Sequence, residues 1–123
     1  MSRLNVANYR HPDASSDSFN LNSDASFTLS GGVSSTERII TTGSWDLATG
    51  NFWTCGAITI PSPTNAVAGT GGLIRVTAAP TFPSECKFPG GTYTAPTAFP
   101  AIIPFYVQNS TTLLMGNWTE GIS

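Results

Sequence analysis

The residue types that carry most enzyme chemistry are few and scattered in this chain. His11 is the only histidine, and it lies beside Pro12 and Asp13 in a segment with few apolar residues. A Ser-His-Asp relay needs a buried base held in one orientation, which such a segment does not provide. Asp46 and Glu85 are a carboxylate pair of the kind that hydrolyses glycosides, but nothing in the sequence fixes their separation. We therefore expect structural roles for these residues and no enzymatic activity.

Metal and cofactor sites are not indicated by the sequence. Cys55, Cys86 and His11 are far apart in the chain, whereas zinc sites use ligands at short spacing. The glycine cluster at 69–72 lacks the Lys-Ser/Thr that follows a phosphate-binding loop, and it precedes a strand. We expect no cofactor and no metal. The two cysteines are expected to be buried free thiols, with a disulfide as the alternative if the protein reaches an oxidising environment.

The charge pattern argues against nucleic acid and membrane partners. The net charge is −2, and the five basic residues are spread singly, so that no basic patch forms. The start of the chain lacks the apolar core of a secretory signal, and no apolar run approaches the ~18 residues of a membrane span. A soluble protein made in the cytosol is expected. Only 10% of residues are charged while 40% are hydrophobic, which predicts a folded chain with a polar uncharged surface or one covered by other subunits.

The stretch at 50–77 is the most informative for the fold. Its first part carries apolar side chains on both faces of an extended segment: Phe52, Ile58 and Ile60 at even positions, and Trp53, Cys55 and Ala57 at odd positions. A strand of this kind needs cover on two sides. Pro61, Pro63 and Asn65 end it before a glycine cluster, and the strand LIRVT follows.

The remaining segments also indicate strands and loops. Residues 33–42 are rich in β-branched side chains between glycines, and residues 103–116 read as a hairpin with a turn at Asn109-Ser110. The proline-rich segment between them is predicted to be a loop pinned by its aromatic residues. No segment has helical periodicity. We therefore predict an all-β fold, with a small β-sandwich or jelly-roll-like body at 33–123 and an extended N-terminal arm at 1–32.

The arm has pairs of apolar residues spaced by two, separated by turn-forming residues. Strands this thin cannot bury themselves, because ordering each residue costs about 1–2 kcal/mol. We expect the arm to attach to another protein surface, and the alternative is a flexible tail. The residues expected to make this attachment are Leu4, Val6, Tyr9, Pro12, Phe19, Leu21, Phe27 and Leu29.

Several of these stretches resemble one class of viral protein. The opening LNVANYRHPDASSDSFNLNSD resembles the start of tail-fibre and appendage proteins of tailed bacteriophages, especially marine and cyanobacterial phages. The stretches GNFWTCGAITIPSPTNAVAGTGGLIRVTAAP, KFPGGTYTAPTAFPAI and FYVQNSTTLLMGNWTEGI are similar to a β-rich module of such appendages. The resemblance covers most of the chain. It implies a virion structural protein, either a short tail-fibre-like appendage or an adaptor component, assembled in the host cytoplasm and located in the virion. A capsid decoration or cement protein is the main variant.

The resemblance and the sparse charge together lead us to expect a homotrimer. The candidate residues for its subunit seam are Trp53, Ala57 and Phe88. An alternative of another class is a carbohydrate-binding module for host-surface glycans, in which Trp45, Trp53 and Trp118 stack on sugar rings. Solvent-facing coplanar indoles would favour sugar binding, whereas buried indoles would favour a purely structural role.

Overall fold

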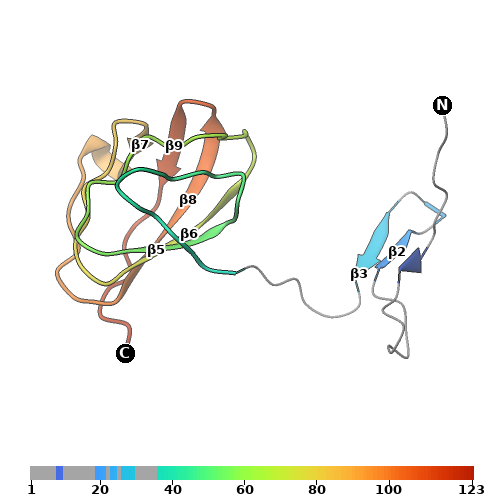
Figure 1. Cartoon of the computed structure of the whole chain (residues 1–123), viewed down its shortest axis with the longest axis horizontal. Coiled ribbons are helices and arrows are strands. Elements are labelled where there is room, and N and C mark those ends of the chain that lie inside the picture. The colour runs from blue at the N-terminus through green and yellow to red at the C-terminus, as the bar shows by residue number, and fades with distance from the viewer. Residues whose placement is uncertain (1–7, 10–18, 22, 25, 30–35) are drawn as a thin grey trace. The chain divides into compact units, whose positions relative to one another are not determined.

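The chain forms two units that consist of strands and loops. The computed structural model describes residues 8–9, 19–21, 23–24, 26–29 and 36–123. The chain divides into one unit at 1–34 and a second at 35–123 (Figure 1). The described part contains no α-helix, and its one helical element is a single 3-10 turn, η1, at Pro89–Gly91. The prediction of an all-β fold is confirmed.

The first unit contains a small antiparallel sheet of three short strands. These are β1 at Asn8–Tyr9, β2 at Phe19–Leu21 and β3 at Phe27–Leu29, in the order β1-β2-β3. Between β2 and β3, the Asp24 carboxylate accepts hydrogen bonds from the backbone N–H and the hydroxyl of Ser26. These bonds lower the pKa of Asp24. Of the predicted arm residues, Leu4, Val6 and Pro12 lie outside the described residues, and the others lie on these strands.

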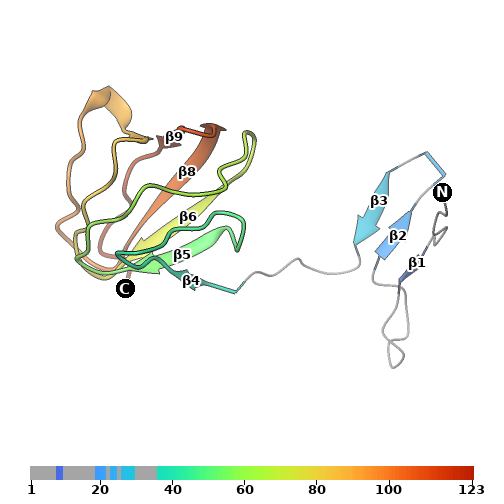
Figure 2. The same ribbon diagram turned by 45° about the horizontal axis from the view of Figure 1, so that its top comes forward.

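The second unit, which we call the body, contains one six-stranded mixed sheet in the order β4-β5-β6-β8-β9-β7. Its strands are β4 at Arg38–Ile39, β5 at Phe52–Cys55, β6 at Gly71–Val76, β7 at Cys86–Lys87, β8 at Ala101–Asn109 and β9 at Thr112–Met115. Figure 2 shows β4, β5, β6, β8 and β9 following one another across the sheet. β5 pairs in parallel with both β4 and β6, and β9 pairs in parallel with β7. The two antiparallel pairs are β6 with β8 and β8 with β9.

The predicted closing hairpin is present, with its turn one residue later than predicted. β8 and β9 are joined at residues 110–111, where the Asn109 side-chain oxygen accepts hydrogen bonds from the backbone N–H and the hydroxyl of Thr111. The register shifts between Val107 and Asn109, which marks a bulge next to the turn. Alternation along β8 then places Ile103, Phe105 and Val107 on one face of the sheet.

The core lies on that face and is covered by loops. Its strand residues are Trp53, Cys55, Ile74, Val76, Cys86, Ala101, Ile103, Phe105, Val107, Leu113 and Met115, all of them buried. The connecting segments add Ile40, Trp45 and Ile60 from outside the strands. The Trp45 ring packs edge-on against Trp53 at 6.5 Å and against Phe105 at 5.8 Å. In the described part of the body, loops therefore cover the sheet where a sandwich would place a second sheet.

The proline-rich segment is held by its aromatic side chains, as predicted. The Phe82 ring lies 5.2 Å from Phe88, 5.3 Å from Tyr93 and 6.1 Å from Trp118. The Tyr93 hydroxyl also donates a hydrogen bond of 2.6 Å to the Pro80 carbonyl. Packing of these half-buried rings fixes the segment, of which only the two residues of β7 join the sheet, at its edge, where prolines are tolerated nearby.

Candidate functional site

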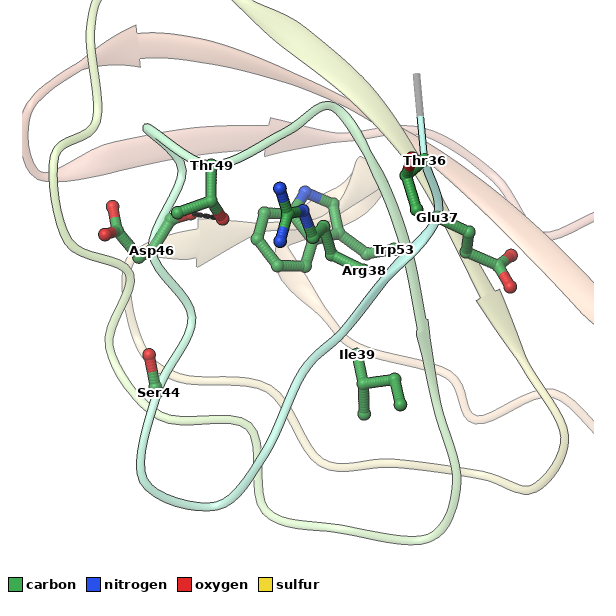
Figure 3. Close-up of a pocket in the computed structure, with 8 residues that line it drawn as sticks. All are labelled: Thr36, Glu37, Arg38, Ile39, Ser44, Asp46, Thr49 and Trp53. Atoms are coloured by element: carbon green, nitrogen blue, oxygen red, sulfur yellow. Dashed lines mark hydrogen bonds between the residues drawn. The ribbon is translucent and has the colours of Figure 1, made fainter. Parts of the chain in front are cut away.

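A polar hollow lies beside the edge strand β4. It has a volume of about 430 Å³ and is lined by Thr36, Glu37, Arg38, Ile39, Ser44, Asp46, Thr49 and Trp53. Figure 3 shows Asp46 and Thr49 on one side of it and Glu37 on the other side, pointing away. Among these lining residues there is no nucleophile paired with a general base. The geometry of this hollow therefore gives no support to catalysis.

The carboxylate of Asp46 is already used to hold the local turn. It accepts a hydrogen bond of 2.8 Å from the Asn65 amide and one of 3.0 Å from the Ala48 backbone N–H. These two bonds lower the pKa of Asp46, the Asn65 bond having the larger effect. Glu85 accepts a different bond, from the Ser62 hydroxyl at 3.1 Å. Both carboxylates thus have structural partners.

The predicted tryptophan platform for sugars is wrong for two of its three members. Trp45 is 1% exposed and Trp53 is 3% exposed, and their ring planes are inclined by 87°. Trp118 is half-buried against the aromatic loop. A sugar-stacking platform needs accessible and roughly coplanar faces, which Trp45 and Trp53 do not offer.

The predicted subunit seam also needs correction. Trp53 alternates with Phe52 along β5, and Trp53 is the residue that faces the core of its own subunit. Phe88 is half-buried and packs against Phe82 and Tyr93. Ala57 is exposed. Two of the three residues chosen for the seam are therefore used inside the body.

The side of the sheet opposite the core is apolar and open to solvent. Strand register places its rows of side chains: Phe52 is opposite Leu73, Leu73 is opposite Pro104, and Tyr106 is opposite Leu114. Ile39 is 70% exposed and Tyr106 is 51% exposed. We call this surface the outer face, and its apolar residues are Ile39, Phe52, Leu73, Ile102, Pro104, Tyr106 and Leu114.

Charged residues also belong to the outer face: Arg75 lies on the inner strand β6, between Thr54 and Ile102 in the register, and Lys87 lies on the edge strand β7. Near β4, the Arg75 guanidinium donates two hydrogen bonds to the Glu37 carboxylate, of 2.7 and 3.0 Å. These bonds lower the pKa of Glu37, while both side chains stay about two-fifths exposed (43% and 41%), so the pair stabilises the fold only weakly. At the other edge, Lys87 of β7 lies beside Leu114 in the register.

A shallow apolar hollow opens on the outer face at the hairpin. It has a volume of about 270 Å³ and is lined by Pro104, Phe105, Tyr106, Leu114, Met115 and Gly116. Gly116 shapes it, because a Cβ at this position would lie 2.6 Å from the Pro104 ring. The hollow therefore suits an apolar side chain better than a polar ligand.

The two cysteines are buried free thiols, as predicted. Burial raises the pKa of Cys55 to about 11 and that of Cys86 to about 12. Neither thiol is therefore poised as a nucleophile near neutral pH. In the part of the chain that the structure describes, no three His, Cys, Asp or Glu residues are grouped so as to hold a metal ion. His11, which the sequence analysis considered and rejected as a metal ligand, lies outside that part.

The chain was compared with protein-family models, with curated proteins and with solved structures, and none of them matched. Within the described residues, no helix is both long and apolar enough to cross a membrane. The sequence predicted an apolar strand with two faces, but it did not predict which residues form the exposed outer face. The signal of this face was present in the hairpin, where Ile102, Pro104 and Tyr106 alternate with the core residues, so that β8 is apolar on both sides.

Proposed function

We propose that this protein is a structural component of a bacteriophage virion, a short tail-fibre-like appendage or adaptor that acts through contacts with other proteins. The observation that carries the proposal is the exposed apolar outer face of the body sheet. Ile39, Phe52, Tyr106 and Leu114 all present substantial side-chain area to solvent on this one surface. The resemblance of the chain to phage appendage proteins is the reason for proposing that this assembly is a phage virion.

An apolar surface of this kind has a physical meaning. The largest patches of monomeric soluble proteins cover about 300–600 Å², and patches in that range are often functional. This chain has 10% charged residues against about 25% in an average protein, so few charges oppose association. A protein that works by assembly benefits from both properties.

The first unit would act as the attachment arm. Its outer strands, β1 and β3, leave strand edges that can add strands from another protein. A capsid decoration protein is a variant of the same proposal, because it would use the same surfaces in the head instead of the tail. The carbohydrate-binding alternative is not favoured by a specific observation, since Trp45 and Trp53 are buried.

The proposal is tested on phage particles made in infected cells by a phage that encodes the chain. Mass spectrometry of gradient-purified particles should detect the protein at a fixed number of copies per particle. Gold-labelled antibody should then place it at the tail or on the head. A protein that is abundant in the lysate and absent from purified particles would refute the proposal.

A further inference from the structure

We propose that the outer face binds the same face of a second copy of this chain, so that two single sheets form one sandwich across two subunits. The inference rests on the proposed function in one respect, that the protein works by assembly. The body sheet packs on loops on one side and has no cover from the described body residues on the other. A second copy supplies the missing sheet.

Four exposed apolar side chains of the outer face supply about half of the area that such pairing buries. Exposed fractions are 70% for Ile39, 41% for Phe52, 51% for Tyr106 and 42% for Leu114. Since large side chains have roughly 150–250 Å² each, these four present on the order of 400 Å². A stable interface buries about 800 Å² per partner, of which about a third is polar or more. The half-buried apolar neighbours and the polar rim of the sheet can supply the remainder.

The shape of the outer face is complementary to itself. Ile39 and Phe52 project from the β4 and β5 side, whereas the hollow of about 270 Å³ lies on the β8 and β9 side. A two-fold axis parallel to the strands brings β4 of one copy over the β9 and β7 side of the other. Phe52 lies in the same register row as Pro104 of the hollow, so that the Phe52 side chain of each copy then faces the hollow of its partner, as an isologous contact requires.

The charges agree with this orientation. Glu37 lies near the β4 edge and Lys87 lies on the β7 edge, at opposite ends of the strand order. The same axis brings the carboxylate of Glu37, which accepts two hydrogen bonds from Arg75 of its own chain, toward the ammonium group of Lys87 in the partner, twice per pair. Opposite charges at the rim favour this register over one that would place β4 on β4.

The packing would follow the ordinary geometry of stacked sheets. Two sheets face each other about 10 Å apart with strand directions inclined by about 30°. This arrangement is two-fold, in contrast to the three-fold assembly expected from the resemblance. The mass of the assembled protein therefore separates the two.

The test uses the purified full-length chain in light scattering over a dilution series. We expect a dimer mass that falls to the monomer mass on dilution. Leu114→Lys and Tyr106→Lys place charges in the interface and should raise the dissociation constant at least about tenfold. The matched control is Val67→Lys, since Val67 is 62% exposed and lies outside the strands, and it should leave the constant unchanged. Unchanged tryptophan emission shows that a variant is folded, because Trp45 and Trp53 lie on the core side.

A charge reversal tests the orientation. Lys87→Glu should weaken the dimer more than Lys87→Ala does, because it brings a second carboxylate toward Glu37 of the partner, and equal effects of the two changes would count against this orientation. Glu37 itself is left unchanged, since its carboxylate accepts the Arg75 hydrogen bonds within the subunit. A monomer at all concentrations, a trimer, or a dimer insensitive to the Leu114 and Tyr106 changes would each overturn the inference. A monomeric protein that is nevertheless found in virions would refute this pairing and leave the proposed function standing. A dimer that is absent from virions would support this pairing and refute the proposed function.

Discussion

At the scale of single residues, the two thiols respond to their surroundings in the same way. Cys55 and Cys86 point into the core from β5 and β7, and each is only 6% exposed. Because an apolar environment disfavours the thiolate, their pKa values rise from the usual 9.0 to about 11 and about 12. In the unfolded chain both thiols ionise near their usual value.

This difference predicts a loss of stability in alkali. Below pH 9 the thiols are protonated in both the folded and the unfolded state, and their contribution to the free energy of unfolding is fully present. As pH rises from about 9 toward 11 to 12, only the unfolded state releases these protons, so the free energy of unfolding falls. Urea unfolding at pH 8.0, 9.5 and 10.5 measures the decline. The double variant Cys55→Ala with Cys86→Ala should be less stable at pH 8 and should show a smaller decline. An equal decline in the free energy of unfolding of both proteins would show that the two thiols do not cause it.

At the scale of elements, the start of β5 and the start of β6 approach very closely. The Leu73 backbone N–H donates a hydrogen bond of 3.0 Å to the Asn51 carbonyl, and the Asn51 amide donates one of 2.8 Å to the Gly71 carbonyl. A Cβ at Gly72 would overlap the Asn51 carbonyl oxygen. The parallel pairing of β5 with β6 therefore depends on the absence of a side chain at this glycine.

We predict that Gly72→Ala destabilises the body by about 3 kcal/mol or more, because backbone must move to make room. Gly43→Ala is the matched control, since nothing lies within 4 Å of its Cβ position and its backbone does not need glycine. Its free energy of unfolding should change by no more than about 0.5 kcal/mol. Urea denaturation of the three proteins gives the comparison. Similar stabilities for the two variants would show that the close approach is not structurally important.

The elements themselves were largely predictable, but their partners were not. Alternation and the Asn109-Ser110 turn are local signals, and they predicted the β8–β9 hairpin correctly. The parallel pairing of β5 and β6 depends on the path of the 15 residues between Cys55 and Gly71, which no local pattern records. The sequence also does not show whether Phe52 or Trp53 faces the core, because both are apolar. For this reason the predicted subunit seam included a core residue, and the residues of the outer face were not predicted.

At the scale of the whole molecule, the division at residues 34 and 35 separates a small three-stranded sheet from the body. The core residues of the body all come from positions 40 to 115. The body therefore has its own core, to which no residue of the first unit contributes among the residues that the structure describes.

We predict that a chain lacking residues 1–34 folds and no longer enters particles. Its circular dichroism should retain a β spectrum and its tryptophan emission should match that of the full chain, because Trp45, Trp53 and Trp118 all lie in the body. Complementation of a phage that lacks the gene measures incorporation. Incorporation at the level of the full chain would count decisively against an attachment arm.

The most direct test of the account is the protein content of particles that carry variants of the outer face. Mass spectrometry of gradient-purified particles from complemented infections gives the copy number of the wild type, Leu114→Lys and Val67→Lys. Assembly through the outer face predicts a fixed copy number for the wild type, the same number for Val67→Lys, and at least a tenfold lower number for Leu114→Lys, on the order of the loss expected when a charge enters an apolar interface. Equal copy numbers for all three proteins, or the absence of the wild type from particles, would contradict it.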